Sequence, residues 1–328
     1  MPTERLRHER PYMLPEPGTA LRVAFVGQAT YFAAAAPSES LPGLTSVFVD
    51  YRGGENVGEL RAALADFRPH AVVVFRPGIV PHGLFADLDA AVLGVAADPL
   101  PRAGEASDDG LEWNLAELRK ADPADFDRVV ATDPLGWEAL AAHLPAWRCL
   151  PLPVADRYFR PVRPPAIPPR VVFLGHSSMH RELFLLHQKH QFDIGHYAFG
   201  LLGDELERVL AEADVGINLH AARWPLIFEH NVLLHLAAGH LLISEPLAPT
   251  FGLEPDIDYL EALDEDYFDL RIHQVQQQPG AYHRLRVRGR AKAEQYRASR
   301  VWPALLTDLF DDLAVFGTAR RHTVVSQA

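Results

Sequence analysis

The residues best suited to chemistry follow two apolar runs in the second half of the chain. The run at 215–219 is followed by His220, and the run at 240–244 is followed by Glu245. A compact apolar helix is predicted between them, with Glu229 at its start. Ligands of parallel α/β sheets lie at the carboxyl ends of the strands, so these side chains should share one edge. Carboxylates there would accept hydrogen bonds from hydroxyl groups of a ligand.

A second group of candidates opens this half of the sequence. A buried strand is predicted to end at Gly175, and His176 and Ser177 come next. Either Ser177 or Ser178 can cap the following helix, whose unpaired N–H groups and positive end attract anions. Arg181 adds a planar, permanently charged fork that suits phosphate. The alternative is an ordinary serine cap beside a surface arginine.

Strands and helices are predicted to alternate in the first half, which indicates βαβ units and a parallel sheet. The predicted strands are 22–27, 45–51, 71–75, 91–96, 126–132 and 148–153, and the predicted helices are 57–67, 111–120 and 136–143. The first strand ends at Gly27, and the loop after it lacks the GxGxxG pattern of a dinucleotide site.

Three loops of this half carry candidate side chains at one predicted edge of the sheet. Thr30 and Tyr31 follow the first strand, Arg76 and His82 follow the third, and Asp98 follows the fourth. Loops at this edge usually carry the active-site groups of such folds. The alternative is that His82 is a solvated loop residue and that Asp98 forms a turn before proline.

The chain is predicted to form two domains. Five prolines between 161 and 169 indicate a stiff, extended linker. In the second domain we expect strands at 170–175, 192–197, 215–219, 240–244 and 256–260, and helices at 202–213, from 264 onward and at 283–297. We divide the chain into an arm (1–19), a first domain (20–160), the linker (161–169), a second domain (170–300) and a C-terminal helix with a tail (301–328).

Composition argues against several classes of function. The chain has 328 residues and a formal net charge of −12, which disfavours nucleic acid and anionic lipid as partners. The one cysteine, Cys149, fits a reducing compartment and reads as an inert thiol. Neither a signal peptide nor an apolar run of membrane-spanning length is found, so we expect a cytoplasmic protein without a transmembrane segment.

Two charged stretches invite other interpretations. The histidine-rich stretch 187–196 lacks a tight pair at metal-ligand spacing joined to a cysteine, so a solvated surface is favoured and no metal site is predicted. The basic stretch 283–297 alternates cations with apolar residues and predicts an exposed helix face rather than a nucleic-acid patch. Leucines four residues apart in 301–313 predict a C-terminal helix with an apolar stripe.

Residues 228–245 resemble the donor-binding half of GT-B glycosyltransferases, in the branch of the group 1 and CgeB-type enzymes. The likeness lies in Phe228-Glu229, in Leu236-Ala237-Ala238-Gly239 and in Leu241-Leu242-Ile243-Ser244-Glu245, and it covers residues 168–310 best. The family has its glutamate closer to the AAG glycine, where this chain has Leu234; Glu229 lies ten residues before Gly239.

The resemblance implies two Rossmann-like α/β domains that face each other across a cleft, with a C-terminal helix that crosses back to the first. It implies a glycosyltransferase of the hexosyltransferase type, which needs neither a metal nor another cofactor. The donor would be a nucleotide-diphosphate sugar, and the acceptor a sugar, glycan, protein or natural product. No oligomeric state is predicted. The donor residues implied are Gly175, His176, Ser177, Arg181, His220, Glu229, Asn231 and Glu245.

The first domain would hold the acceptor, with Gly27, Thr30, Tyr31 and Arg76 beside it. If transfer inverts the sugar, a general base must reach the acceptor hydroxyl, and His82 or Asp98 is the candidate. Two alternatives stay open. One is a sugar-nucleotide epimerase of the same fold, and the other is a non-catalytic nucleotide-sugar-binding protein.

Overall fold

The computed structural model describes residues 14–16, 18–37, 41–54, 56–105 and 107–317. The chain forms two compact units, one made of Met1–Leu152 with Ser299–Ala328 and the other of Pro153–Ala298. The second unit thus begins at Pro153, before the predicted linker at 161–169. Most of the predicted arm and the tail beyond 317 lie outside the described residues. No helix of the described ranges is long and apolar enough to cross a membrane.

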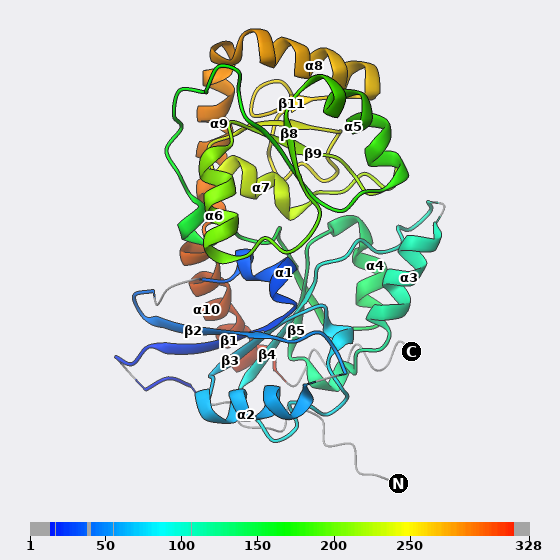
Figure 1. Ribbon diagram of the computed structural model, residues 1–328. Helices are drawn as coiled ribbons and strands as arrows, with labels where there is room; N and C mark the ends of the chain where they lie inside the picture. Colours follow the sequence, from blue (N-terminus) through cyan, green and yellow to red (C-terminus); the bar gives the residue numbers. More distant parts are fainter. Residues whose placement is uncertain (1–13, 17, 38–40, 55, 106, 318–328) are drawn as a thin grey trace. The chain divides into compact units, whose positions relative to one another are not determined.

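The first unit is built on a six-stranded parallel sheet, drawn in blue to green in Figure 1. Its strand order is β2-β1-β3-β4-β5-β6. The strands are β1 Leu21–Gly27, β2 Leu44–Asp50, β3 Ala71–Phe75, β4 Ala91–Ala96, β5 Arg128–Ala131 and β6 Ala146–Cys149. The helices are α1 Ala29–Phe32, α2 Val57–Phe67, α3 Asp109–Leu118, α4 Trp137–Ala141 and α10 Ala298–Phe316, which begins at the last residue of the second unit.

Side chains alternate between two cores along these strands, as the period of a strand requires. Val26 and Val74 belong to the core that Leu60 of α2 completes. Phe25 and Phe75 point to the opposite face and pack against Trp302 of α10, with ring centroids 5.0 and 6.2 Å away. The predicted C-terminal helix that returns to the first domain is therefore confirmed.

Polar contacts fasten α10 to this unit as well. The indole Nε1 of Trp302 donates to the carbonyl of Ala35 at 2.7 Å. Arg128 of β5, which is 2% exposed, forms an ion pair with Asp312 at 2.6 Å. Loss of either partner would leave a charge at this buried position without its counter-ion, so the pair holds α10 against β5.

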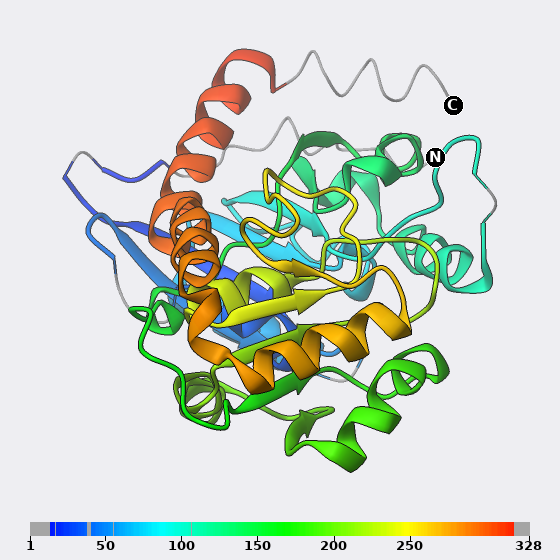
Figure 2. The same cartoon turned by 90° about the horizontal axis from the view of Figure 1, so that it is seen from above.

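The second unit has a five-stranded parallel sheet with the order β11-β10-β9-β7-β8. Its strands are β7 Val171–Leu174, β8 Ile194–Tyr197, β9 Val215–Asn218, β10 Leu241–Ser244 and β11 Leu260–Glu261. Its helices are α5 Met179–Gln191, α6 Gly203–Glu212, α7 His230–Ala237, α8 Glu265–Gln277 and α9 His283–Ala293. Helices α5 (green) and α8 (orange) share a core on one face of the sheet (Figure 2), while α7 and α9 contact each other and β10.

Both sheets have the same doubly wound order. In each, the chain makes one strand, then its neighbour on one side, and then moves to the other side for the third strand. The order therefore reverses between β1 and β3 in the first sheet and between β7 and β9 in the second. Ligands of open α/β sheets bind at the carboxyl ends of the strands beside such a point.

Two predicted strands were misplaced. The strand predicted at 256–260 is β11, only Leu260–Glu261, because the Asp258 carboxylate accepts from the Glu254 N–H at 3.0 Å and holds the preceding residues in a turn. Asp256 has a φ of 57°, which a strand does not allow. The last strand of the first sheet, predicted at 148–153, is β6, Ala146–Cys149.

The prediction that the basic stretch 283–297 forms an exposed helix face is wrong in part. Arg286 of α9 is 3% exposed and donates to the carbonyls of Gly239 and Arg163 at 2.9 and 2.8 Å. Arg290 donates to the Arg160 carbonyl at 2.7 Å. These cations therefore tie the segment before β7 to α9, and they are inside the unit rather than on a binding surface.

Two buried histidines, His235 and His240, and the partly buried His230 lie in and beside α7. His230 donates to the Pro153 carbonyl at 2.9 Å. His240 donates from Nε2 to the Leu210 carbonyl at 2.8 Å, so its Nδ1 accepts from Nδ1 of His235 at 3.1 Å. A side chain on Gly216 would meet the His235 ring at 2.3 Å, so a glycine is required in β9 for this ring to fit.

This packing predicts a loss of stability in acid. Burial lowers the pKa of His230 and of His240 to about 4, and it also lowers the pKa of His235. The unfolded chain takes up these protons below about pH 6.5, whereas the folded chain does not until about pH 4. The free energy of unfolding should be at its full value above pH 6.5 and fall as the pH drops toward 4.

Urea unfolding between pH 7.5 and 4.5 measures this effect. His230→Gln keeps an N–H donor for the Pro153 carbonyl but does not titrate, so its stability should fall less steeply with pH. The control His283→Gln changes an exposed histidine and should keep the wild-type slope. Equal slopes for all three proteins would contradict the prediction.

Candidate functional site

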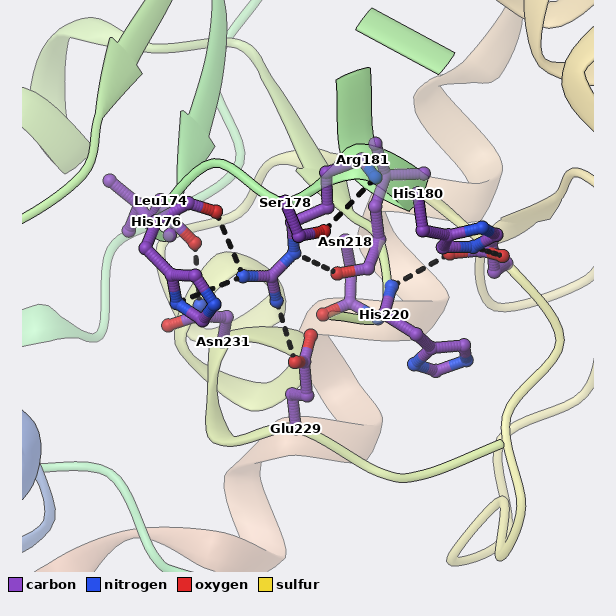
Figure 3. Close-up of polar contacts among 12 residues, drawn as sticks. Leu174, His176, Ser178, His180, Arg181, Asn218, His220, Glu229 and Asn231 are labelled. Carbon is purple, nitrogen blue, oxygen red and sulfur yellow. Dashed lines mark hydrogen bonds and ion pairs between the residues drawn. The ribbon is translucent and has the colours of Figure 1, made fainter. Parts of the chain in front are cut away.

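The turn between β7 and α5 lies beside the point of strand reversal in the second sheet. Ser178 caps α5, since its hydroxyl accepts from the Arg181 N–H at 3.2 Å. His176 and Ser177 precede it and are exposed at the edge. The Asn231 amide donates to the Leu174 carbonyl at 2.8 Å and joins α7 to the end of β7 (Figure 3). This turn thus presents a helix N-terminus with exposed polar side chains.

Arg181 is a buried connector rather than a free phosphate ligand. It is 3% exposed, and its Nε donates to the Leu219 carbonyl at 2.9 Å. Its Nη1 donates to the His176 carbonyl at 3.0 Å, and its Nη2 donates to Glu229 Oε1 at 2.8 Å (Figure 3). One guanidinium therefore joins the ends of β7 and β9 to the start of α7.

Glu229 stands at the N-cap position of α7 but makes no side-chain cap bond. Its carboxylate instead pairs with Arg181, and its side chain is 18% exposed. Burial raises the pKa of this carboxyl, and the charge of Arg181 opposes that rise. The carboxylate is therefore held at the edge of the sheet, where its exposed part can meet a ligand.

Glu245 is also held by neighbours. Its Oε1 accepts from Nε2 of His180 at 2.7 Å, and its Oε2 accepts from the His220 N–H at 2.7 Å. The His220 ring donates from Nε2 to the Pro246 carbonyl at 2.8 Å, so its Nδ1 is an acceptor. Among the described residues this buried Nδ1 has no hydrogen-bond partner.

The structure thus brings all eight predicted donor residues to the same end of the second sheet. Gly175 lies against Arg181, since a Cβ on this glycine would be only 3.2 Å from Arg181 Nη1. His180, the second residue of α5, orients Glu245 and was not predicted from the sequence. Its place three residues after Ser177 on a predicted helix was the one signal available.

A cavity of about 180 Å³ lies at the corresponding edge of the first sheet. Arg76 after β3 and Asp98 after β4 line it and form an ion pair at 2.8 Å. Gln28 after β1 accepts from Arg76 Nη1 at 3.2 Å. The ring of Tyr31 lies 5.2 Å from the Arg76 guanidinium carbon. Two of the predicted first-domain residues therefore share one cavity beside the strand reversal.

The other predicted first-domain residues lie apart from that lining. Exposed His82 donates to the Lys120 carbonyl at 2.7 Å and does not line the cavity with Asp98. Gly27 ends β1, where a side chain would meet Phe75 Cβ at 3.0 Å, and Thr30 lies in α1. Gln28 and the exposed Trp113 line the cavity but were not predicted as site residues from the sequence.

The histidine-rich stretch is tied to protein groups. His187 lies 3.3 Å from Asp269, and His196 donates to the Gly175 carbonyl at 2.8 Å. Within the described ranges, no three His, Cys, Asp or Glu side chains are grouped so as to hold a metal ion.

Removing Arg181 should destabilise the second unit severely. Arg181→Met leaves the Glu229 carboxylate without its cation and two carbonyls without donors, at an expected cost of about 3–5 kcal/mol in the free energy of unfolding. Arg181→Met/Glu229→Gln should recover part of this loss because no unpaired charge remains. Chemical denaturation measures both.

The control is Arg208→Met, which removes an arginine whose side chain is 58% exposed and pairs with Glu212. Exposed pairs contribute only about 0–1 kcal/mol. Similar losses for Arg181→Met and Arg208→Met would show that the Arg181 contacts do not hold the site together.

Comparisons with known proteins point to one fold. The sequence matches no protein-family model and no curated protein. Several solved structures are similar to it. Anabaena HepE in complex with UDP-glucose has a TM-score of 0.57 at 8% identity, over 90% of this chain and 100% of that chain. A glycosyltransferase from Rickettsia africae has a TM-score of 0.55 at 9% identity (90% and 99% of the two chains), and sucrose-phosphate synthase from Thermosynechococcus elongatus has a TM-score of 0.54 at 14% identity (89% and 99%). These likenesses span almost the whole chain, so the chain has the GT-B fold of these glycosyltransferases.

Proposed function

We propose that the protein is a glycosyltransferase that moves a sugar from a nucleotide-diphosphate sugar to an acceptor. The observation that carries this proposal is the group of polar residues around Arg181 at the strand reversal of the second sheet. In this fold that edge is where a ligand binds. The similar HepE structure is a complex with UDP-glucose, which supports a nucleotide sugar as the ligand.

The donor diphosphate would lie against the turn between β7 and α5. The exposed His176 and Ser177 and the N-terminus of the 13-residue helix α5 offer donors and a positive dipole end. Charge grows on the leaving phosphate as the sugar departs, and fixed donors stabilise such charge. Arg181 acts through these groups, because its own bonds fix the His176 carbonyl and Glu229 in place.

Carboxylates at the same edge would bind the hydroxyl groups of the donor. Glu229 and Glu245 are acceptors only. Arg181 fixes one oxygen of Glu229, whereas His180 and the His220 N–H hold both oxygens of Glu245. Their charge disfavours a position beside the diphosphate, so ribose or sugar hydroxyls are the suitable partners. Metal independence and a cytoplasmic location stay predictions from the sequence.

Of the two candidate bases, Asp98 is the one that the cavity favours. In a direct displacement, the acceptor oxygen bonds to the anomeric carbon while the bond from that carbon to the diphosphate oxygen breaks. Its electron pair leaves with the nucleoside diphosphate. The hydroxyl proton passes to the Asp98 carboxylate, which the paired Arg76 keeps oriented.

Donor binding is the first test. The nucleotide sugar that binds best in a thermal-shift screen should stabilise the protein by about 2.7 kcal/mol at a hundred times its Kd. Glu229→Gln should weaken that ligand roughly tenfold to a hundredfold in calorimetry, because charge-assisted bonds to hydroxyls are lost. Equal affinities would move the hydroxyl contact away from Glu229. The control Glu205→Gln changes an exposed carboxylate of α6.

Turnover is the second test. Asp98→Asn should lower kcat by about a hundredfold or more with little change in donor affinity, as expected for loss of a general base. His82→Ala should keep the wild-type rate, because this ring donates a hydrogen bond to the Lys120 carbonyl. The reverse pattern would make His82 the base, and wild-type rates in both variants would exclude both.

Reactions with the donor alone separate the two alternatives. A sugar-nucleotide epimerase would turn the donor over without an acceptor. A non-catalytic protein would bind it without turnover in the presence of any acceptor. A transferase releases nucleoside diphosphate at full rate only when its acceptor is added.

A further inference from the structure

The cavity of the first unit combines an exposed indole with charged groups of both signs. Trp113, in the first half of α3, is 60% exposed and lines it. Arg52 and Arg76 supply cations, and Asp98 and Glu117 supply carboxylates. We propose that this cavity binds a sugar ring, so that the acceptor is a saccharide; this rests on the proposed function.

The polar lining fits a ligand whose groups both donate and accept. Asp98 and Glu117 only accept, the arginines only donate, and the amides of Gln28 and Asn114 do both. A sugar hydroxyl satisfies either kind of partner. Buried polar groups without partners are costly, so a ligand with several hydroxyls suits this lining better than an apolar one.

The Arg76 guanidinium is fixed beside Asp98 by two hydrogen bonds. Its Nη2 donates to Asp98 at 2.8 Å and its Nη1 donates to Gln28 at 3.2 Å. The carboxylate and the arginine neutralise each other, which disfavours an anionic ligand beside Asp98 and favours a neutral one.

Trp113 provides a flat apolar surface next to these groups. A pyranose has one face of C–H groups and a rim of hydroxyls, so its face can cover the indole while its rim reaches the polar lining. Aromatic side chains give large contact areas at low entropy cost, and an exposed tryptophan is otherwise unfavourable in water. Asn114, next in sequence, is fixed by donation to the Pro99 carbonyl at 2.9 Å.

The backbone that lines the cavity already has its shape without a ligand. Arg76 has a φ of 58°, a left-handed conformation that costs energy in a residue other than glycine. Gly78 lies so close to α3 that a side chain would meet the Glu117 carbonyl at 1.9 Å. The loop after β3 and the helix that carries Trp113 are therefore in direct contact, and the lining is formed without a ligand.

The experiment measures sugar binding in the absence of any nucleotide sugar. The probes are the methyl glycosides of glucose, galactose, mannose and N-acetylglucosamine. Phenol and benzoate represent a neutral aromatic and an anionic aromatic ligand instead of a sugar. Binding to the full chain is observed by saturation-transfer NMR. At least one glycoside should bind, and Trp113→Leu should weaken it about tenfold, the effect of losing an aromatic contact. Asn114→Ala should also weaken it.

The matched control is Trp224→Leu, which removes an exposed tryptophan of the second unit and should leave glycoside binding unchanged. Preference for phenol or benzoate, binding of no glycoside, or glycoside binding that Trp113→Leu and Asn114→Ala both leave unchanged would overturn the inference. Since no donor is present, the result is independent of the donor tests. Glycoside binding by a protein that binds no nucleotide sugar would refute the transferase and leave the sugar site standing.

Discussion

The ion pair between Arg181 and Glu229 joins parts of the second unit that are distant in sequence. The two residues are 48 positions apart, and the same guanidinium also holds the carbonyls of His176 and Leu219. A buried guanidinium is stable only when its donors are satisfied, so the ends of β7 and β9 and the start of α7 must adopt this arrangement together. The geometry of the proposed donor site follows from that requirement.

A second guanidinium has a similar place in the first unit. Arg76 follows the third strand of its sheet and bonds to groups after the first and fourth strands, Gln28 and Asp98. The two sheets have the same strand order, so each has one strand reversal, and each reversal has an arginine beside it. The difference is exposure: Arg181 is 3% exposed, whereas the Arg76 side chain is 31% exposed and lines a cavity. Arg181 therefore positions other groups, and Arg76 can meet a ligand itself.

Much of the fold could be predicted because local signals and burial agree. The strands 71–75 and 91–96 and the helix 57–67 match to the residue, since β-branched runs and a clear helical pattern end at turn-forming residues. The run 256–260 has a strand-like pattern too, but a local carboxylate bond keeps it in a turn. Arg286 and Arg290 were predicted to be exposed because a charge pattern does not show tertiary contacts. In the structure they donate to the carbonyls of Arg163 and Arg160, in the segment before β7.

For the candidate site, the sequence predicted which side chains share one edge of the sheet but not how they pair. Sequence placed Glu229, Glu245 and Arg181 at one edge, because parallel strands end together. It did not show which groups pair, since pairing over 48 residues depends on tertiary packing. For the same reason Trp113 went unnoticed: in a surface helix an isolated aromatic residue is unremarkable until the cavity beside it is known.

Hydrogen–deuterium exchange with the best-binding nucleotide sugar shows whether the donor lies at the edge of the second sheet that Arg181 and Glu229 shape. We expect slower exchange of backbone amides in 175–181 and 229–231, where the donor would lie, with no protection of the first unit beyond that of the free protein. Protection confined to the cavity loops at 76–79 and 96–100, with 175–181 unchanged, would contradict a donor site in the second unit.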